Sequence, residues 1–254
     1  MKKIVIASAN NHKVSEISIK IQPFFDQILS LADFPEIGEI IEDGNTIEEN
    51  SFIKSKAAFK YTKIASVADD TILEVDALNG DPGLFTARYA GENATYEENM
   101  TKLLEKLDGI EDSARTARFR TIISYVNGVD DFHVEGIIEG KILNNRVGNN
   151  GFGYDPIFYS TEFNLSLAEM DSDLKNKISH RGLAIEKFVS KIKKLVKWKN
   201  LHFSYCFSAK LLVKTSFETL HLIHLRAKLK LIIPWMIFQI CLLYTSPSPR
   251  DCKT

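Results

Sequence analysis

Short apolar runs alternate with amphipathic stretches along most of the chain, and this alternation predicts an α/β fold. The run Lys2–Ser8 has the length and composition of a strand, and residues 14–21 repeat apolar side chains at helical spacing. Residues 114–127 and 132–143 alternate as two strands, joined by the turn-forming pair Asn127-Gly128. We therefore expect a hairpin that extends a sheet, with helices packed on it.

Two further helices are marked by their first turns. Thr46 with Glu49, and Thr95 with Glu98, have the spacing of a capping box, in which a hydroxyl and a carboxylate satisfy backbone N–H groups. The second of these helices has one apolar stripe, which predicts a buried face. Its members are Met100, Leu103, Leu104 and Leu107.

The candidate chemistry begins with two adjacent carboxylates. The apolar run Ile64–Ala68 leads directly into Asp69 and Asp70, which the hydroxyl of Thr71 follows. We expect these side chains in a turn at the end of a strand, where active sites of α/β proteins collect and where oxygen ligands suit Mg²⁺. An ordinary polar turn has the same sequence and is the competing interpretation.

A second candidate site follows the first strand. Its loop and helix start consist of Ser8, Ala9, Asn10, Asn11, His12 and Lys13. Backbone N–H groups at a helix start attract anions, and Lys13 adds a positive charge, so this segment suits a phosphate group. It lacks the glycines of a Walker or a Rossmann loop, and a plain strand-to-helix connection is the alternative.

Three more stretches have polar or aromatic groups that suit a nucleotide. Asn50 and Lys54 lie one helical turn apart. Residues 151–156 place two aromatic side chains among glycines, as a platform for a nucleobase requires, although a glycine-rich turn gives the same pattern. Lys175 and the triplet 179–181, Ser-His-Arg, follow downstream and on their own indicate only a polar surface.

Taken in order, these stretches resemble a known family. The motifs SANNHK, EDGNTIEENSFIK, ADDTILEVDALNGDPGLFTARYAGE, GFGYDPIF and KNKISHR are similar to those of the inosine triphosphate pyrophosphatases, also called dITP/XTP pyrophosphatases. Members hydrolyse aberrant purine nucleoside triphosphates to the monophosphate and pyrophosphate. The resemblance extends over roughly residues 1–196. It implies a mixed twisted sheet flanked by helices, two lobes around a central cleft, Mg²⁺ as cofactor, a purine nucleoside triphosphate as substrate, and a homodimer.

The resemblance also implies roles for single residues. The loop Ser8–Lys13 and Lys54 would hold the triphosphate, and Thr71 would contact the substrate. Asp70 would bind Mg²⁺ and act as the general base, with Asp69 in a lesser role. The nucleoside-binding set would be Phe152, Gly153, Tyr154, Asp155, Lys175, His180 and Arg181.

Two positions depart from the family pattern. Ile72 stands where a glycine is common, and a β-branched side chain in a left-handed turn would be strained. Ile41 stands where the family's second acidic metal ligand is expected. We expect the neighbouring Glu42 to take its place as the second ligand of Mg²⁺.

Two other functions stay open at this point. A pyrophosphatase of different base preference, such as the Maf-like group, would share the chemistry, although the SHR and GFGYDP motifs favour a purine substrate. A nucleotide-binding module without turnover would share the pocket, and Ile41 and Ile72 make it conceivable. Pyrophosphate release in the presence of Mg²⁺ separates these possibilities.

Composition separates the last part of the chain from the rest. The 254 residues have a formal net charge of −1, but residues 201–254 hold seven Lys and Arg against two Asp and Glu. All three cysteines lie in this segment, and all 13 glycines lie before it. A mildly acidic body without cysteine predicts a cytoplasmic protein that binds no nucleic acid.

We expect a pyrophosphatase domain over residues 1–198 and a tail of doubtful origin over 199–254. The tail's apolar run, residues 231–244, contains Pro234 and Gln239, and it is shorter than the roughly 20 residues that a membrane-spanning helix needs, so we expect no membrane anchor. The ending LLYTSPSPRDCKT resembles translated adapter sequence, which favours a non-native extension. A membrane-associating tail and a genuine extra helix pair are the alternatives.

If the tail is dispensable, a chain stopped after Lys199 should fold, keep its activity and be more soluble than the full chain, because exposed apolar surface is removed. Circular dichroism, an activity assay and a solubility measurement on the two chains provide the test. A shortened chain that is unfolded or inactive would show that the tail belongs to the domain.

Overall fold

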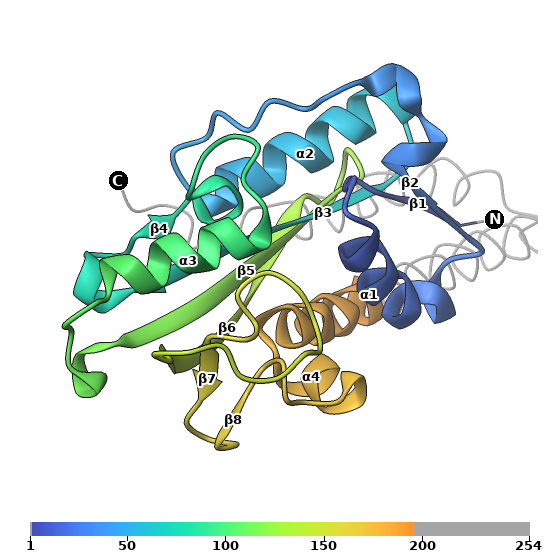
Figure 1. Cartoon of the computed structure of the whole chain (residues 1–254). Helices are drawn as coiled ribbons and strands as arrows, with labels where there is room; N and C mark the ends of the chain where they lie inside the picture. Colours follow the sequence, from blue (N-terminus) through green and yellow to red (C-terminus); the bar gives the residue numbers. More distant parts are fainter. Residues whose placement is uncertain (1, 196–254) are drawn as a thin grey trace, which may run out of the picture. The chain divides into compact units, whose positions relative to one another are not determined.

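A mixed sheet of eight strands is the central layer of the structure, a computed structural model that describes residues 2–195 (Figure 1). The strands are β1 Lys3–Ile6, β2 Gln27–Ser30, β3 Ser66–Val75, β4 Pro82–Gly83, β5 Thr116–Val126, β6 Phe132–Ile142, β7 Phe158–Ser160 and β8 Leu165–Ser166. Their order is β2-β1-β3-β5-β6-β7-β8, with β4 paired to β3. β1 lies parallel to β2 and β3, and the other pairs are antiparallel. The sheet is therefore mixed, as predicted.

The three helices that the sequence predicted are present, and two further helices follow them in the chain. They are α1 Asn11–Ile21, α2 Ile47–Thr62, α3 Tyr96–Lys106, α4 Ser172–Ile178 and a helix over residues 180–195. Short 3-10 turns lie at Gln22–Phe24, Leu31–Asp33, Pro35–Ile37, Asp76–Leu78, Thr86–Arg88 and Asp112–Ala114. The Thr46 hydroxyl accepts a hydrogen bond from the Glu49 N–H, and Thr95 with Glu98 forms a complete capping box. The capping box at Thr95 is confirmed. At Thr46 only its hydroxyl half forms, because the Glu49 carboxylate accepts a hydrogen bond of 2.7 Å from the Asn45 N–H instead.

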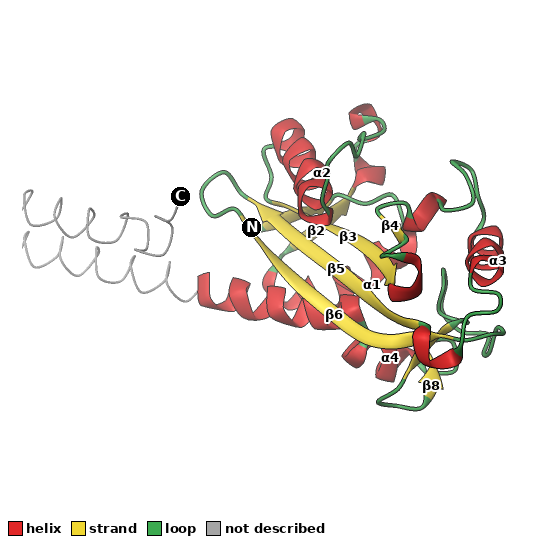
Figure 2. Ribbon diagram, turned by 90° about the vertical axis from the view of Figure 1, so that its left-hand side faces the viewer, coloured by secondary structure: helices red, strands yellow, loops and turns green. Residues whose placement is uncertain are grey.

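Helices cover both faces of the sheet (Figure 2). α2 lies on one face, where the hydroxyls of Ser51 and Ser124 are 2.9 Å apart. The helix over 180–195 lies on the other face, where Phe188 packs against Tyr125 with ring centroids 5.9 Å apart. Ser124 and Tyr125 are neighbours in β5. Because side chains alternate along a strand, one of them contacts α2 and the other contacts the helix on the opposite face.

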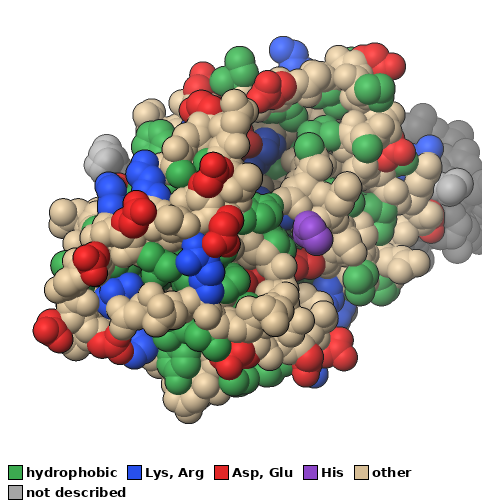
Figure 3. Space-filling view, viewed as in Figure 1, with side chains coloured by type: hydrophobic (Ala, Val, Ile, Leu, Met, Phe, Trp, Pro, Cys, Tyr) green, Lys and Arg blue, Asp and Glu red, His purple; other side chains and the backbone are tan. Residues whose placement is uncertain are grey.

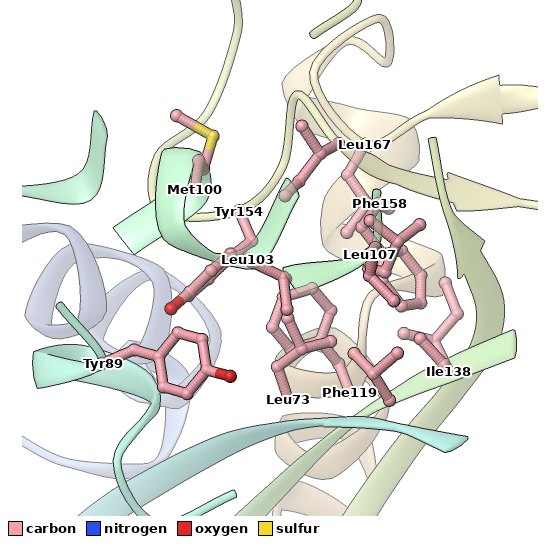
Figure 4. Close-up of a cluster of buried hydrophobic side chains, with 14 of the residues drawn as sticks. Leu73, Tyr89, Met100, Leu103, Leu107, Phe119, Ile138, Tyr154, Phe158 and Leu167 are labelled. Carbon is pink, nitrogen blue, oxygen red and sulfur yellow. The ribbon is translucent and has the colours of Figure 1, made fainter. Parts of the chain in front are cut away.

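One apolar cluster joins α3 to the sheet (Figure 4). Within it, the predicted stripe of α3 is buried, with Leu104 packed at its margin. Cluster members shown in the figure are Leu73, Tyr89, Met100, Leu103, Leu107, Phe119, Ile138, Tyr154, Phe158 and Leu167. The stripe was therefore correctly predicted as core, and it fixes α3 next to the segment that contains Tyr154.

The strand β3 is longer than predicted. It runs over ten residues, so Asp69 and Asp70 lie inside the strand and not in a turn at its end. The reason is the pairing with β5, the first strand of the predicted hairpin. β5 pairs with β3 along its whole length, from Ser66 opposite Val126 onward. An acidic pair that would form a turn on local preference is thus held in extended conformation by its neighbour.

The predicted strain at Ile72 is wrong for the same reason. Ile72 lies in β3, is buried, and packs with Ile47 and Ile122. In the described part of the chain, the non-glycine residues with positive φ are Lys63, Asn79 and Asn164, and Ile72 is not among them. An extended backbone accepts a β-branched side chain without strain.

Gly136 of β6 lets the helix over 180–195 approach the sheet closely. A Cβ atom on Gly136 would lie 2.0 Å from the carbonyl oxygen of His180 and 2.5 Å from the backbone nitrogen of Ala184. These are backbone atoms, which cannot turn aside as a flexible side chain can. Gly136 therefore fixes how close the start of this helix, which contains Arg181, comes to β6.

Gly136→Ala should force the helix away from the sheet and lower the free energy of unfolding by about 1–3 kcal/mol, as is usual for overpacking. Urea denaturation measures this loss. Ile137→Ala is the matched control in the same strand, because the Ile137 side chain is 37% exposed and should lose less. Equal losses in the two variants would mean that the close approach at Gly136 is not required.

Candidate active site

A gap in the pairing of β3 lies beside the end of β1. β1 pairs with β3 at Ser66 and Val67, and β4 pairs with it at Leu73 and Glu74. Between these points, residues 68–72 have a strand neighbour on one edge only, namely β5. The predicted acidic pair thus lies in the one stretch of β3 with an open edge.

The open edge also presents polar backbone groups. Val67 accepts a hydrogen bond of 2.7 Å from the chain just after β1, and Leu73 donates one of 2.9 Å to the Thr86 hydroxyl near β4. Backbone groups of alternate residues point to the same edge of an antiparallel strand. Asp69 and Thr71 therefore direct their N–H and C=O groups into the gap.

The side chains of Asp69 and Asp70 point to opposite faces of the sheet, because neighbours in a strand alternate. Asp70 faces α2, and its Oδ1 is 3.0 Å from Lys54 Nζ. Asp69 faces the helix over 180–195, and its Oδ2 is 3.1 Å from Arg181 Nε. Each carboxylate therefore has a cation of its own, and the two groups lie on either side of β3.

Lys54 joins Asp70 to the second predicted metal ligand. Its Nζ is 2.9 Å from Glu42 Oε2 as well as 3.0 Å from Asp70 Oδ1. Burial lowers the pKa of Lys54, but the Asp70 and Glu42 carboxylates outweigh it, so this pKa is raised and the ammonium stays charged. Ile41 points to solvent at 74% exposure. One carboxylate oxygen of Asp70 and one of Glu42 thus lie within ion-pair distance of the same ammonium group.

Asp69 has two cations on a single oxygen. Its Oδ2 is 3.1 Å from Lys13 Nζ and 3.1 Å from Arg181 Nε. Burial opposes ionisation of Asp69, but Lys13 and Arg181 hold its pKa well below the usual range. Burial also lowers the pKa of Lys13, and the charges of Lys54 and Arg181 act in the same direction.

Arg181 has further partners that fix its plane. Its Nη1 donates to Glu16 Oε2 at 2.8 Å, and its Nη2 donates to Thr71 Oγ1 at 3.3 Å. Thr71 in turn shares a hydrogen bond of 2.8 Å with Thr121. Glu16 was not among the residues predicted from the sequence. It lies one helical turn after Lys13, and this i,i+3 spacing was the available signal.

The segment Ser8–Lys13 is a strand-to-helix connection, as predicted. Asn10 caps α1, because its Oδ1 accepts hydrogen bonds from the N–H groups of His12 at 3.0 Å and Lys13 at 3.4 Å. The Asn10 N–H in turn donates to Ser8 Oγ at 3.2 Å. Ala9 and Asn11 complete the turn, and the cap places Lys13 on the first turn of α1, where it reaches Asp69.

The glycine-rich segment is held together by Asp155. Its Oδ2 accepts a hydrogen bond of 2.7 Å from the Phe152 N–H and lies 2.6 Å from Lys175 Nζ. Gly151 has φ +81°, and a Cβ there would lie 2.1 Å from the same oxygen. Burial raises the pKa of Asp155, and Lys175 opposes this. Gly153 also has a positive φ, +67°. The glycines therefore allow the tight turn that sets the Phe152 ring.

The Phe152 ring brings three parts of the chain together. His12 of α1 stacks on it with centroids 5.2 Å apart and planes at 19°, and Tyr96 of α3 lies 6.0 Å away. Lys175 Nζ and Arg181 Cζ lie over the ring at 5.0 Å and 5.5 Å. The aromatic platform expected from the sequence thus consists of Phe152, directly beside the cationic residues.

Two predicted residues have side chains that lie in the core. Tyr154 is 4% exposed and donates its hydroxyl to the Thr86 carbonyl at 2.9 Å, so its ring does not extend the platform (Figure 4). His180 stacks on Phe119 at 4.5 Å, and its Nδ1 has no hydrogen-bond partner among residues 2–195. Burial and the charge of Arg181 keep the pKa of His180 well below its ordinary value, so the ring is neutral at neutral pH.

The face shown in Figure 3 is hollowed near its middle, and basic side chains lie inside the hollow. The described residues 2–195 contain no group of three or more His, Cys, Asp or Glu side chains placed to hold a metal ion. Glu42 and Asp70 share one cationic position, at Lys54 Nζ. Magnesium commonly takes one or two carboxylates together with phosphate oxygens, and this pair fits such a site.

These features define a class: an α/β protein whose sheet has an open edge lined by an aromatic ring, paired carboxylates and buried cations, as an anionic nucleotide requires. The chain belongs to the Ham1 family, whose family model matches residues 4–191. The resemblance stated from the motifs is confirmed by this match.

Individual relatives agree with the family assignment. A dITP/XTP pyrophosphatase of Thermoanaerobacter pseudethanolicus is 46% identical over 192 residues, which are 76% of this chain and 97% of the relative. One of Clostridium perfringens is 45% identical over 204 residues, covering 78% and 100% of the two chains. The solved structure of a HAM1 protein from Coxiella burnetii is 38% identical with a TM-score of 0.71, over 76% of this chain and 100% of that one. The predicted fold class is confirmed.

Within residues 2–195, no helix has the length and hydropathy to cross a bilayer. The tail predicted over residues 199–254 lies outside the described residues.

Proposed function

We propose that this protein is a dITP/XTP pyrophosphatase, which hydrolyses aberrant purine nucleoside triphosphates to the monophosphate and pyrophosphate. The observation that carries the proposal is the position of Arg181. Its guanidinium lies over the Phe152 ring at 5.5 Å and shares Asp69 with Lys13. A ring for a base and a lysine for phosphate are therefore parts of one connected site, and relatives that are 43–46% identical have this name.

The phosphate end of the site would lie between Lys13 and Lys54. The two lysines are close enough for the charge of Lys54 to lower the pKa of Lys13. They come from opposite sides of β3, since Lys13 pairs with Asp69 and Lys54 with Asp70. The two ammonium groups would neutralise a triphosphate at the open edge from both sides. This neutralisation stabilises the negative charge that develops during phosphoryl transfer.

Asp70 would act as the general base. Its side chain is part-exposed, at 16%, and it lies on the α2 face of the open stretch of β3. In the proposed step, water attacks the α-phosphorus, Asp70 accepts the water proton, and the bond between the α-phosphorus and the bridging oxygen breaks toward pyrophosphate. Lys54 Nζ, 3.0 Å from Asp70 Oδ1, orients this carboxylate when no metal is bound.

We propose that Glu42 and Asp70 hold Mg²⁺ together with the substrate phosphates. The support is the convergence of their oxygens on Lys54 Nζ, at 2.9 Å and 3.0 Å, which marks a position suited to a cation. When bound, the ion would neutralise phosphate charge and polarise a phosphoryl oxygen. Lys54 would then turn toward the phosphates, because two cations cannot occupy the same position.

The base end would be read by Phe152 and Arg181. The ring, on which His12 stacks in this structure, would offer its surface to the base in place of that imidazole, and Asp155 with Lys175 fixes its loop. Arg181 uses three of its five N–H groups on Asp69, Glu16 and Thr71. Two N–H donors remain for a substrate, and a 6-oxo group on the base is an acceptor of the required kind. The homodimer implied by the family resemblance stays a prediction.

A panel of nucleoside triphosphates with Mg²⁺ tests the function directly. Pyrophosphate release from dITP, ITP and XTP should exceed that from dATP by at least about a hundredfold in kcat/KM, because the 6-amino group of adenine would place a donor against the donors of Arg181. Guanine shares the 6-oxo group, so discrimination against dGTP would come from its 2-amino group. Equal hydrolysis of dITP and dATP would contradict this assignment of Arg181. If no purine nucleoside triphosphate is hydrolysed, the protein would instead be a nucleotide-binding module without turnover.

Asp70→Asn tests the proposed base. The change keeps the size of the side chain but removes its charge, so turnover of dITP should fall by at least about a hundredfold, the lower range for a lost general base. Pyrophosphate release measures the loss, and circular dichroism confirms that the variant is folded. Glu74→Gln is the control, since Glu74 lies in the same strand but is paired with Arg118 and Arg120. An Asp70→Asn enzyme with near-full activity would place the base elsewhere.

A further inference from the structure

Asp69 takes no part in the proposed chemical step, yet it is the most enclosed acid of the site. Its side chain has 0% exposure, and its Oδ1 has no hydrogen-bond partner in the described part of the chain. Burying an ionised carboxylate is strongly unfavourable unless cations compensate it. Asp69 is compensated entirely through its other oxygen, which is 3.1 Å from both Lys13 Nζ and Arg181 Nε.

The two cations that share this oxygen come from separate elements. Lys13 lies on the first turn of α1, and Arg181 lies near the start of the helix over 180–195. In the proposed function, on which this inference rests, Lys13 belongs to the phosphate end and Arg181 to the base end. Without an anion between them the two cations would repel each other, and neither has room to retreat, since both are buried or nearly so.

We propose that Asp69 is a positioning residue that sets both ends of the nucleotide site at once, by holding Lys13 and Arg181 on one carboxylate oxygen. The family resemblance implied only a lesser role for Asp69, and its sequence context suggested a turn. In β3 it instead fixes the distance between the phosphate-binding lysine and the base-reading arginine. Loss of its charge should therefore weaken the binding of phosphate and of base together.

Glu16 provides a matched comparison. It contacts Arg181 Nη1 at 2.8 Å, and the ion pair of Lys13 is with Asp69 instead. Removing the Glu16 charge should therefore disturb the base end alone. Asp69 pairs with two cations and Glu16 with one. Comparing their variants therefore distinguishes a positioning role of Asp69 from general damage to the fold.

The experiment measures binding without turnover, on the full chain, with two probes that each report one end of the site. Inorganic tripolyphosphate has no base, and inosine has no phosphate. Isothermal calorimetry or NMR titration gives the dissociation constant of each probe for the wild type, Asp69→Asn and Glu16→Gln. Because no hydrolysis is involved, a failure of the proposed reaction and a failure of this proposal give different results.

Asp69→Asn should raise the dissociation constants of both probes by at least about tenfold, which corresponds to about 1.4 kcal/mol. Glu16→Gln should weaken inosine binding and leave tripolyphosphate within about twofold of the wild type. An Asp69→Asn protein that is folded by circular dichroism and binds either probe as the wild type does overturns the proposal. So does a Glu16→Gln protein with the same double defect.

A double variant keeps the test decisive if Asp69→Asn alone does not fold. Lys13→Met with Asp69→Asn removes one cation together with the anion, so the repulsion is gone and Arg181 keeps Glu16. This protein should be more stable to heat than the single variant and should bind inosine more tightly. A double variant no better than the single one in either measurement contradicts the proposal.

Discussion

A strand of ten residues cannot be paired along its length by a neighbour of four, and this mismatch between β3 and β1 makes room for the site. β1 ends after Ile6, and the chain turns at once into α1 under the cap of Asn10. β3 continues and is held straight by β5 on its other edge. The open stretch of β3 thus adjoins a helix start on one side of the gap, and this arrangement brings Lys13 to Asp69.

The balance of charge around β3 follows from this geometry. Neighbouring side chains of a strand point to opposite faces, so the Asp69 and Asp70 carboxylates lie next to different cations. In a turn, two adjacent carboxylates would share one environment, and each would raise the pKa of the other. The strand avoids that coupling, because Lys13 and Arg181 serve Asp69 while Lys54 serves Asp70.

Elements whose signals are local could be predicted from the sequence. Helix caps such as Thr95 with Glu98 depend on residues three positions apart, and the hairpin depends on alternation around Asn127-Gly128. The length of β3 could not be predicted in the same way. Two aspartates and a threonine favour a turn on local preference, and only the long-range pairing with β5 keeps them extended. The supposed strain at Ile72 followed from that one wrong boundary.

The same limit applies to the candidate site. Motif order indicated which residues gather, but not which way their side chains point. Phe152 and Tyr154 look equivalent in the sequence, yet they lie two residues apart in a turn that contains glycines of positive φ, so one ring faces the cations and the other enters the core. Glu16 is an ordinary exposed helix residue by pattern. Its role appears only once the helix over 180–195, which approaches β6 at Gly136, places Arg181 beside α1. Side-chain direction in an irregular segment depends on such distant contacts, and no local pattern contains them.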